Sequence, residues 1–254
     1  MLLRLSYELL VVSDVHISAM NDTRGELFLN MLRSIDSTRL KYLVLLGDIF
    51  DFCFGGSEYF SRKYAAVASE LERLSSEGVR VFFVEGNHEF MLQELGWKGV
   101  QFMRAKALCL DLPQGPRVAF IHGDELENSW HYRLYASLIR SRLSRFMASK
   151  LPQAFLDKLA LSISAKSRQR SYLKPVDENE VVSKIKSVLE QNQAQVGIVG
   201  HFHIPFCAQF PDSSLQVLGL DSWDKPNCLG FDGKDFYRIY FKDNKTESQL
   251  IQWN

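Results

Sequence analysis

Histidines, carboxylates and one carboxamide recur in five short polar motifs along this chain. The motifs are Asp14-Val15-His16, Gly47-Asp48, Gly86-Asn87-His88-Glu89, His122-Gly123-Asp124 and Gly200-His201-Phe202-His203. Each motif directly follows an apolar run, at residues 9–13, 42–46, 81–85, 118–121 and 196–199. Imidazole, carboxylate and carboxamide groups are ligands for divalent metal ions. The motifs therefore predict a metal site, provided that the fold brings them together.

The apolar runs predict how the motifs meet. A strand that is apolar along its whole length is buried on both faces and belongs to a sheet covered by helices. Ligands of such sheets gather beyond the carboxyl ends of the strands. Residues two apart in a strand point the same way, so Asp14 and His16 can share one ion, and His201 and His203 can face one cavity. Asp48 has two carboxylate oxygens and can bridge two ions.

Two ions side by side suit a particular chemistry. Separated by roughly 3.5–4 Å, they can clamp the attacking and leaving oxygens of a phosphoryl displacement. Gly47, Gly86 and Gly200 precede the expected ligands, and glycine permits tight backbone turns at strand ends. Asp51 and Asp124 lie close to expected ligands. Each either orients a ligand histidine or caps a following helix.

The rest of the chain predicts the elements that position these motifs. Helical spacing of apolar residues predicts helices at 26–35 and 59–74, and a last helix at 177–193. Residues 215–253 alternate apolar and polar side chains, which predicts antiparallel strands. Strands and helices alternate before that point, so we expect an α/β fold with a layered β-sheet core flanked by helices. No internal repeat is visible, and we expect one domain over residues 1–254.

Residues 128–174 break this pattern, because they show no strand signal and are strongly basic. Their only acidic residue is Asp157. The basic residues are Arg133, Arg140, Arg142, Arg145, Lys150, Lys158, Lys166, Arg168, Arg170 and Lys174. Leu134, Leu138, Leu143 and Phe146 fall at helical spacing, so we expect an inserted helical cap that suits anionic groups or a membrane surface. The alternative is a helical hairpin that packs on the body with its charges solvated.

Composition and charge argue against several other classes of protein, such as secreted, disulfide-rich and membrane-spanning proteins. The 254 residues hold 30 Lys plus Arg and 30 Asp plus Glu, so net charge suggests no partner. The four cysteines show no Cys-x-x-Cys spacing, which is typical of free thiols in a reducing compartment. The first residues contain no apolar signal segment, and no apolar stretch approaches the roughly 20 residues that span a bilayer. We expect a cytoplasmic protein that can contact a membrane only at its surface.

In order and type, the five motifs resemble those of the calcineurin-like metallophosphoesterases, from Leu9 to His203. The resemblance implies an α-β-β-α sandwich and two metal ions. One ion would be held by Asp14, His16, Asp48 and His203, and the other by Asp48, Asn87, His122 and His201. His88 would protonate the leaving oxygen or stabilise charge on the phosphoryl group, so His88 and bridging Asp48 are the expected catalytic residues. The family favours Mn, while the mixed oxygen and nitrogen ligands also admit Fe or Zn.

Within that superfamily the chain is most similar to the UDP-2,3-diacylglucosamine diphosphatases of lipid A synthesis. Gly47-Asp48-Ile49-Phe50-Asp51, the basic segment after His122-Gly123-Asp124 and the stretch Leu218-Gly219-Leu220-Asp221-Ser222-Trp223 carry this resemblance. It implies hydrolysis of the nucleotide sugar to UMP and 2,3-diacylglucosamine 1-phosphate. The side chains expected to bind substrate are Lys166, Arg168, Arg170, Leu138 and Phe146. The chain departs from that family at His88, where Arg is usual, and at Phe52-Cys53-Phe54-Gly55-Gly56.

Other functions fit parts of the same pattern. A phosphodiesterase or phosphatase for another nucleotide, phospholipid or phosphoprotein would use the same metal site. A nuclease is disfavoured because no further DNA-binding domain is visible, so we expect no nucleic acid partner. A non-catalytic scaffold that binds proteins would not need a complete ligand set, yet all seven ligand positions and His88 are present.

Overall fold

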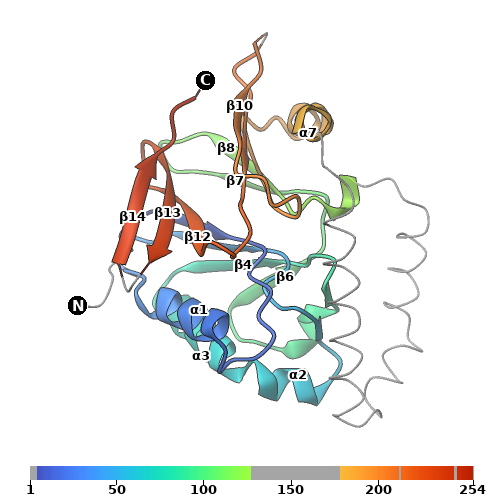
Figure 1. Cartoon of the computed structure of the whole chain (residues 1–254), viewed down its shortest axis with the longest axis vertical. Helices are drawn as coiled ribbons and strands as arrows, with labels where there is room; N and C mark the ends of the chain where they lie inside the picture. The colour runs from blue at the N-terminus through green and yellow to red at the C-terminus, as the bar shows by residue number, and fades with distance from the viewer. Residues whose placement is uncertain (1–4, 127–177, 212, 243–244, 254) are drawn as a thin grey trace.

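Two β-sheets face each other in this structure, a computed structural model that describes residues 5–126, 178–211, 213–242 and 245–253 (Figure 1). The larger sheet has seven strands in the order β14-β13-β12-β1-β2-β4-β6. Its strands are β1 (Leu9–Val12), β2 (Tyr42–Leu46), β4 (Arg80–Val84), β6 (Val100–Met103), β12 (Asn227–Phe231), β13 (Phe236–Lys242) and β14 (Lys245–Leu250). The smaller sheet has the order β10-β11-β9-β8-β7. Its strands are β7 (Leu108–Asp111), β8 (Arg117–Ile121), β9 (Val196–Val199), β10 (Cys207–Gln209) and β11 (Gln216–Gly219).

Parallel pairing at the centre of each sheet positions the motifs. In the larger sheet β1 pairs with β2, β2 with β4 and β4 with β6, all in parallel. In the smaller sheet β8 pairs in parallel with β9. The carboxyl ends of parallel neighbours lie at one edge of a sheet, so the loops after β1, β2 and β4 share one edge and the loops after β8 and β9 share another.

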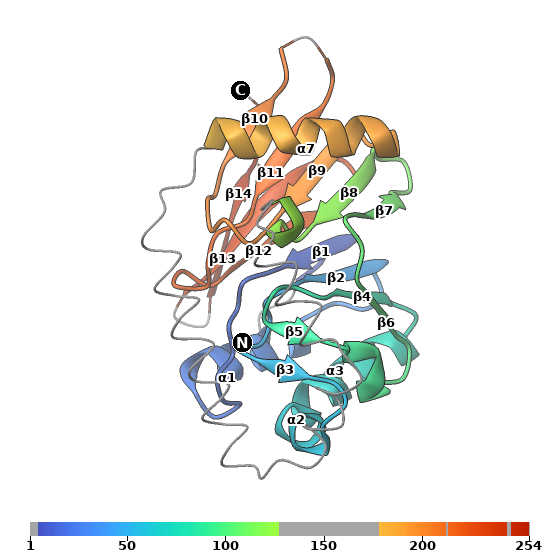
Figure 2. The ribbon, with the colours of Figure 1, turned by 90° about the vertical axis from the view of Figure 1, so that its right-hand side faces the viewer.

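Helices cover both outer faces of the pair of sheets. The helices α1 (Thr23–Arg33), α2 (Glu58–Lys63) and α3 (Ala65–Ser76) lie on the side of the larger sheet, and α7 (Glu178–Asn192) lies on the side of the smaller sheet (Figure 2). Buried residues form three clusters that match the three interfaces. Phe28 and Leu71 pack with the larger sheet, Val44 and Phe120 meet between the sheets, and Ile185 packs on the smaller sheet. The predicted α-β-β-α sandwich is confirmed.

The first helix forms where apolar spacing predicted one. Asp22 caps it by accepting a hydrogen bond from the Gly25 backbone N–H at 2.7 Å, which satisfies a donor that a helix start leaves unpaired. Phe28 and Leu32 are buried on its inner face. The helix ends at Arg33, two residues before the predicted end.

The prediction of a single helix at 59–74 is wrong, because the chain forms two helices, α2 and α3, with a break at Tyr64. Tyr64 has non-helical backbone angles of φ −106° and ψ 16°. Its ring stacks on Phe50 at a centroid distance of 3.8 Å, and its hydroxyl donates to the Phe52 carbonyl at 3.1 Å. This tertiary packing coincides with the break, and apolar spacing along the sequence contains no sign of it.

The prediction of antiparallel strands after residue 215 is correct for β12, β13 and β14, and for β11 it holds on one side only. The first three pair antiparallel at the edge of the larger sheet. By contrast, β11 joins the smaller sheet, parallel to β9 and antiparallel to β10. Two further short strands, β3 (Cys53–Phe54) and β5 (Glu89–Phe90), pair in parallel and were not predicted.

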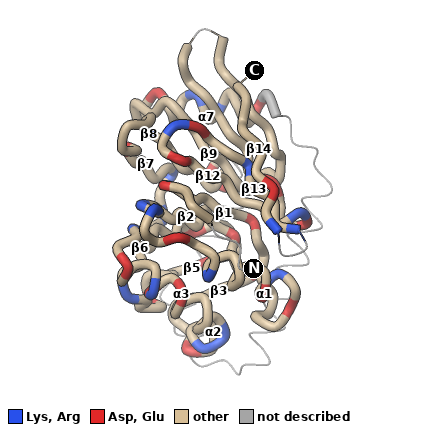
Figure 3. Tube along the Cα trace, turned by 90° about the vertical axis from the view of Figure 1, so that its left-hand side faces the viewer, with Lys and Arg blue, Asp and Glu red and all other residues tan. Residues whose placement is uncertain are grey.

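Charged residues of both signs are interspersed along the described chain (Figure 3). All four cysteines are free thiols, as their spacing predicted, and Cys53 and Cys228 are buried. Among the described residues, no helix is both long and apolar enough to cross a membrane. The basic segment at residues 128–174, with Leu138, Phe146, Lys166, Arg168 and Arg170, lies outside the described residues.

Candidate metal centre

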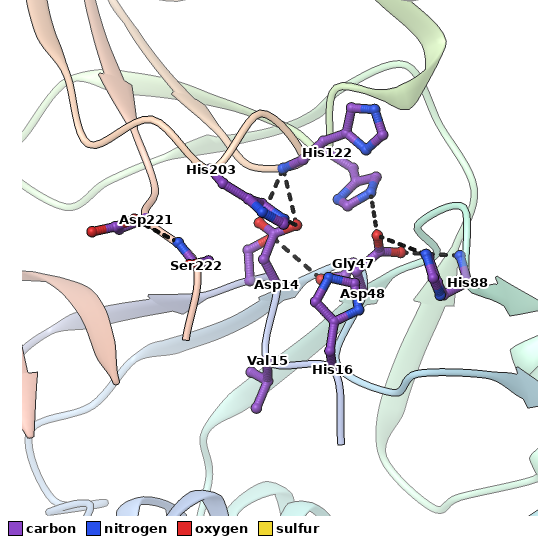
Figure 4. Close-up of polar contacts among 12 residues, drawn as sticks. Asp14, Val15, His16, Gly47, Asp48, His88, His122, His203, Asp221 and Ser222 are labelled. Carbon is purple, nitrogen blue, oxygen red and sulfur yellow. Dashed lines mark hydrogen bonds and ion pairs between the residues drawn. The ribbon is translucent and has the colours of Figure 1, made fainter. Parts of the chain in front are cut away.

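The five sequence motifs meet where the two sheets face each other. Asp14 and His16 follow β1, Asp48 follows β2, Asn87 and His88 follow β4, His122 follows β8, and His201 and His203 follow β9. Their side chains converge on one region between the sheets, and the labelled ones are seen in Figure 4. The motifs thus come from both sheets.

Five of these residues adopt a backbone conformation that side chains rarely take. Asp14, His16, Asp48, His201 and His203 have positive φ angles of 55°, 54°, 53°, 66° and 57°. The argument that Asp14 and His16 share a side of one strand is therefore wrong, because β1 ends at Val12 and both residues lie in the loop that follows. Single left-handed residues are strained and cluster at functional sites.

The first group of donors consists of Asp14, His16 and His203, whose ligand atoms all lie within 4.8 Å of one another. Asp14 is fully buried, and its Oδ1 lies 3.2 Å from His203 Nε2. The backbone N–H of His201 donates to both oxygens of Asp14, at 3.1 and 3.0 Å. One carboxylate therefore links the loops after β1 and β9.

The second group consists of Asp48, His122 and His201, also within 4.8 Å. Asp48 Oδ2 lies 3.5 Å from His122 Nε2. Asn87 joins this group through its carboxamide, because its Oδ1 lies 3.4 Å from the same His122 nitrogen. These four residues are those that the resemblance assigned to one ion.

A third group links the first two, because it contains His16, Asp48 and His88 within the same limit. A carboxylate oxygen of Asp48 therefore lies within 4.8 Å of a ring nitrogen of His16 on one side, and within 4.8 Å of ring nitrogens of His122 and His201 on the other. The ring of His88 is close as well, with its Nε2 4.0 Å from Asp48 Oδ2. The geometry thus places His88 within reach of an ion at this point, beside the residues expected to be ligands.

Hydrogen bonds fix which ring nitrogen of His122 and of His88 faces the centre. His122 Nδ1 lies 2.8 Å from the Leu46 carbonyl, so this nitrogen donates and Nε2 faces Asp48. His88 Nδ1 lies 2.6 Å from the Asp51 carbonyl, which leaves its Nε2 turned toward the centre. The Asp51 carboxylate is 3.7 Å from His16 Nδ1 and accepts a hydrogen bond from Ser18.

Asp51 and Asp124 were each predicted either to orient a ligand histidine or to cap a following helix, and the structure decides between these roles for Asp51. Asp51 contacts histidines of the centre, and the next helix, α2, has Ser57 as its N-cap residue, so Asp51 does not cap it. Asp124 is the first residue of the short 3₁₀ helix η2 (Asp124–Leu126) and lies 3.7 Å from the Arg104 guanidinium. Arg104 follows β6, so this ion pair joins the His122 loop to the larger sheet.

The pKa values at the centre show that buried carboxylates and histidines stabilise one another's charged forms. Burial alone would raise the pKa of Asp14, but the hydrogen bond and charge of His203 outweigh it and lower that pKa to about 2. Burial would lower the pKa of His122, yet the charge and hydrogen bond of Asp48 raise it to about 10. Burial lowers the pKa of His16 to about 4.

This charge pattern tests whether the residues fit a metal. Among the described residues, the ion pairs of Asp14 and Asp48 are all to histidines, and both carboxylates are buried. Buried carboxylates need cationic partners, and neutral histidines become ligands when a divalent cation supplies that charge. The donor set of two carboxylates, a carboxamide and four imidazoles fits divalent cations.

The glycines that precede the donors, Gly47, Gly86 and Gly200, were predicted to permit tight backbone turns, and the structure shows a further reason for them. Only Gly47, at φ +79°, needs a left-handed turn. Gly86 is needed for space, because a Cβ there would lie 2.7 Å from the Asp48 backbone nitrogen and 2.8 Å from His122 Nε2, and would collide with Asp48 Oδ1. A Cβ at Gly200 would likewise lie 2.8 Å from Asp14 Oδ2. A Cβ at Gly47 would also collide with the His122 ring, so all three glycines let the backbone approach the donors.

One buried side chain beside the centre stands in a sequence motif, but no role was predicted for it. Glu89 is fully buried and accepts hydrogen bonds from the backbone of the Asp48 loop. Burial and the nearby Asp48 charge raise the pKa of Glu89 to about 8, against the lowering effect of its backbone donors. The only signal in the sequence was that Glu89 is an acidic residue next to His88 and was not among the expected metal ligands.

Comparison with known proteins assigns the family. The family model for calcineurin-like phosphoesterases matches residues 7–205. The UDP-2,3-diacylglucosamine hydrolase of Neisseria gonorrhoeae is 32% identical over 231 residues, which cover 87% of this chain and 93% of that protein. The protein of the same name from Stutzerimonas stutzeri is 29% identical over 243 residues, which cover 92% of this chain and 98% of that protein. The chain therefore belongs to the calcineurin-like phosphoesterase family, and it is a hydrolase.

Proposed function

We propose that the chain binds two divalent metal ions and hydrolyses the pyrophosphate bond of UDP-2,3-diacylglucosamine. One ion is held by Asp14, His16, Asp48 and His203, and the other by Asp48, Asn87, His122 and His201. The observation that carries the proposal is the membership of Asp48 in two donor groups, one with His16 and one with His122 and His201. A carboxylate in that position can bridge two ions.

The residues around the ions have separate tasks in the reaction. When bound, two divalent ions supply charge stabilisation for the attacking and leaving oxygens of the phosphoryl group. Asp48 spaces the two sets of donors and is held by the His88 backbone N–H, which donates to its Oδ1 at 3.0 Å. His88 presents Nε2 to the centre because its Nδ1 is bound to the Asp51 carbonyl, and from there it can donate a proton to the leaving oxygen.

The substrate is supported by the relatives and by the basic segment. Two relatives named UDP-2,3-diacylglucosamine hydrolase match 87% and 92% of this chain, well beyond the metal motifs. The sequence places ten basic residues and a helical apolar pattern in residues 128–174, directly after the His122 motif. Acyl chains need apolar side chains and a diphosphate needs cations, so Leu138 and Phe146 are proposed for the first task and Lys166, Arg168 and Arg170 for the second. We propose Mn for both sites and a cytoplasmic location at the membrane surface.

A panel of substrates tests the proposal. The protein loaded with Mn²⁺ is assayed on UDP-2,3-diacylglucosamine, on UDP-glucose and on bis-p-nitrophenyl phosphate. We expect the diacylated nucleotide sugar to have the highest kcat/KM and to yield UMP. Rapid cleavage of the soluble esters with no action on the diacylated substrate would leave the general alternative, a phosphodiesterase or phosphatase for another nucleotide, phospholipid or phosphoprotein.

A substitution at Asp48 tests the metal ligands separately from the substrate. Asp48→Asn should lose bound metal and nearly all turnover on every substrate, measured by inductively coupled plasma mass spectrometry and by assay. The control is Asp111→Asn, which changes an exposed carboxylate paired with Arg117 and should leave both unchanged. Two ions retained per chain with full activity in Asp48→Asn would show that Asp48 does not bridge.

A further inference from the structure

The Glu89 carboxylate collects four backbone N–H groups from two different loops. One oxygen accepts from Asp48 at 3.0 Å and from Gly86 at 3.1 Å. The other oxygen accepts from Ile49 at 2.7 Å and from Phe50 at 3.0 Å. The side chain is fully buried, so water does not compete for these bonds. A buried backbone N–H that loses its acceptor costs free energy, so these four bonds favour one arrangement of the two loops.

Three of these donors are consecutive and begin at a strained residue. Asp48 has φ 53°, in the left-handed region that residues with a Cβ avoid. The N–H groups of Asp48, Ile49 and Phe50 all donate to Glu89, as successive backbone N–H groups do where a turn of the chain forms a concave site for an acceptor. Glu89 occupies that site with its carboxylate, so it stabilises the conformation in which the Asp48 side chain points at the centre.

The fourth donor ties this conformation to the loop that carries Asn87 and His88. Gly86 begins that loop, and its N–H shares one Glu89 oxygen with the N–H of Asp48. The His88 N–H in turn donates to Asp48 Oδ1 at 3.0 Å, and the Cys53 N–H donates to the His88 carbonyl at 3.0 Å. These hydrogen bonds fix the loops after β2 and β4 to one another around the Asp48 carboxylate, and Glu89 is bonded to both loops.

We propose that Glu89 is a positioning residue for Asp48: it holds the Asp48 carboxylate at the point where both sets of donors meet. This inference rests on the proposed function, because it takes Asp48 as the shared ligand. Glu89 acts through the backbone of the Asp48 loop and does not touch the ions or the substrate. Its loss therefore acts on metal affinity first.

Glu89→Gln is the variant that tests this, because it keeps size and shape and replaces one acceptor oxygen by an NH₂ donor. Two backbone N–H groups then face a donor, whichever way the amide turns. We expect metal affinity to fall roughly 10–100-fold, the range found when groups behind metal ligands are removed. The measurement is titration of the metal-free protein with Mn²⁺ alone, by isothermal calorimetry. Turnover should recover at high Mn²⁺, since His88 and the donors remain.

Glu85→Gln is the matched control. Glu85 is also a buried glutamate, 5% exposed, and its carboxylate accepts from the Leu92 backbone N–H at 2.7 Å, in the turn after β5. Both variants weaken buried hydrogen bonds to backbone, so both should lower the melting temperature of the metal-free protein. Only Glu89→Gln should lower Mn²⁺ affinity. Equal losses of affinity in the two variants, or wild-type affinity in Glu89→Gln, would overturn the proposal.

Two further variants complete the test. If circular dichroism shows that Glu89→Gln is unfolded, Glu89→Asp replaces it, with Glu85→Asp as control. The shorter side chain keeps the carboxyl group but cannot reach both loops, and unchanged affinity again overturns the proposal. Asp48→Asn is titrated alongside. Affinity kept in Asp48→Asn would refute the proposed ligand set and the role of Glu89 with it. Affinity lost in Asp48→Asn and kept in Glu89→Gln would refute the role of Glu89 alone.

Discussion

Asp48 and His122 come from different sheets, yet Asp48 Oδ2 lies 3.5 Å from His122 Nε2. Asp48 follows β2 of the larger sheet and His122 follows β8 of the smaller one. His122 Nδ1 also lies 2.8 Å from the carbonyl of Leu46, the last residue of β2, so the histidine contacts the larger sheet twice. The centre is therefore an interface between the two sheets, and its donors keep their places only while the sheets stay packed.

His88 should act on the phosphoryl group without holding metal. His88→Ala is expected to keep two ions per chain and to lose roughly 10²–10⁴-fold in kcat, as is typical when a general acid is removed. Metal content and kcat are measured on the same sample. Since His88 lies in a donor group with His16 and Asp48, the metal content decides its role. Fewer than two ions in the variant would make His88 a ligand.

Gly86→Ala should disturb both the centre and the fold. The added methyl collides with Asp48 Oδ1 and lies 2.7 Å from the Asp48 backbone nitrogen and 2.8 Å from His122 Nε2, so we expect weaker metal binding and a lower melting temperature. The reverse control is Gly78→Ala, where a Cβ meets nothing within 4 Å but φ is +96°. That variant should lose about 1 kcal/mol of unfolding free energy through backbone strain and keep its metal affinity. Wild-type metal affinity in Gly86→Ala would show that the loops move apart without cost.

The basic segment should serve a lipid substrate and not the chemistry. Burying one methylene of an acyl chain is worth about 0.8 kcal/mol, so a few buried carbons dominate affinity. Leu138→Glu is expected to abolish hydrolysis of UDP-2,3-diacylglucosamine and to spare bis-p-nitrophenyl phosphate. Leu250→Glu, which changes an exposed leucine at 51% exposure on β14, is the control and should affect neither substrate. Equal loss on both substrates in Leu138→Glu would mean that the segment only supports the fold.

The sequence predicted the layers of the fold and the close approach of the donor residues, for a simple reason. Strands such as 42–46 and 196–199 are buried on both faces, so their apolar runs are continuous and their ends are marked by polar residues. The family and the α-β-β-α sandwich came from the resemblance of the five motifs, in order and type, to those of the calcineurin-like metallophosphoesterases.

Features set by tertiary contacts were beyond the sequence. The break at Tyr64 coincides with stacking on Phe50, and the parallel pairing of β11 depends on the position of β9. The left-handed backbone at Asp14 and His16 contradicts the alternation that a strand would give. Three of the four hydrogen bonds of Glu89 join residues 39 to 41 positions apart, so no short spacing in the sequence reveals them.

The shared role of Asp48 is the central claim, and diffraction from Mn²⁺-soaked crystals near the Mn absorption edge tests it most directly. Two anomalous peaks are expected between the sheets, roughly 3.5–4 Å apart. The Asp48 carboxylate should contact both, with Asp14, His16 and His203 around one peak and Asn87, His122 and His201 around the other. A single peak, or two peaks of which Asp48 contacts only one, would contradict the account.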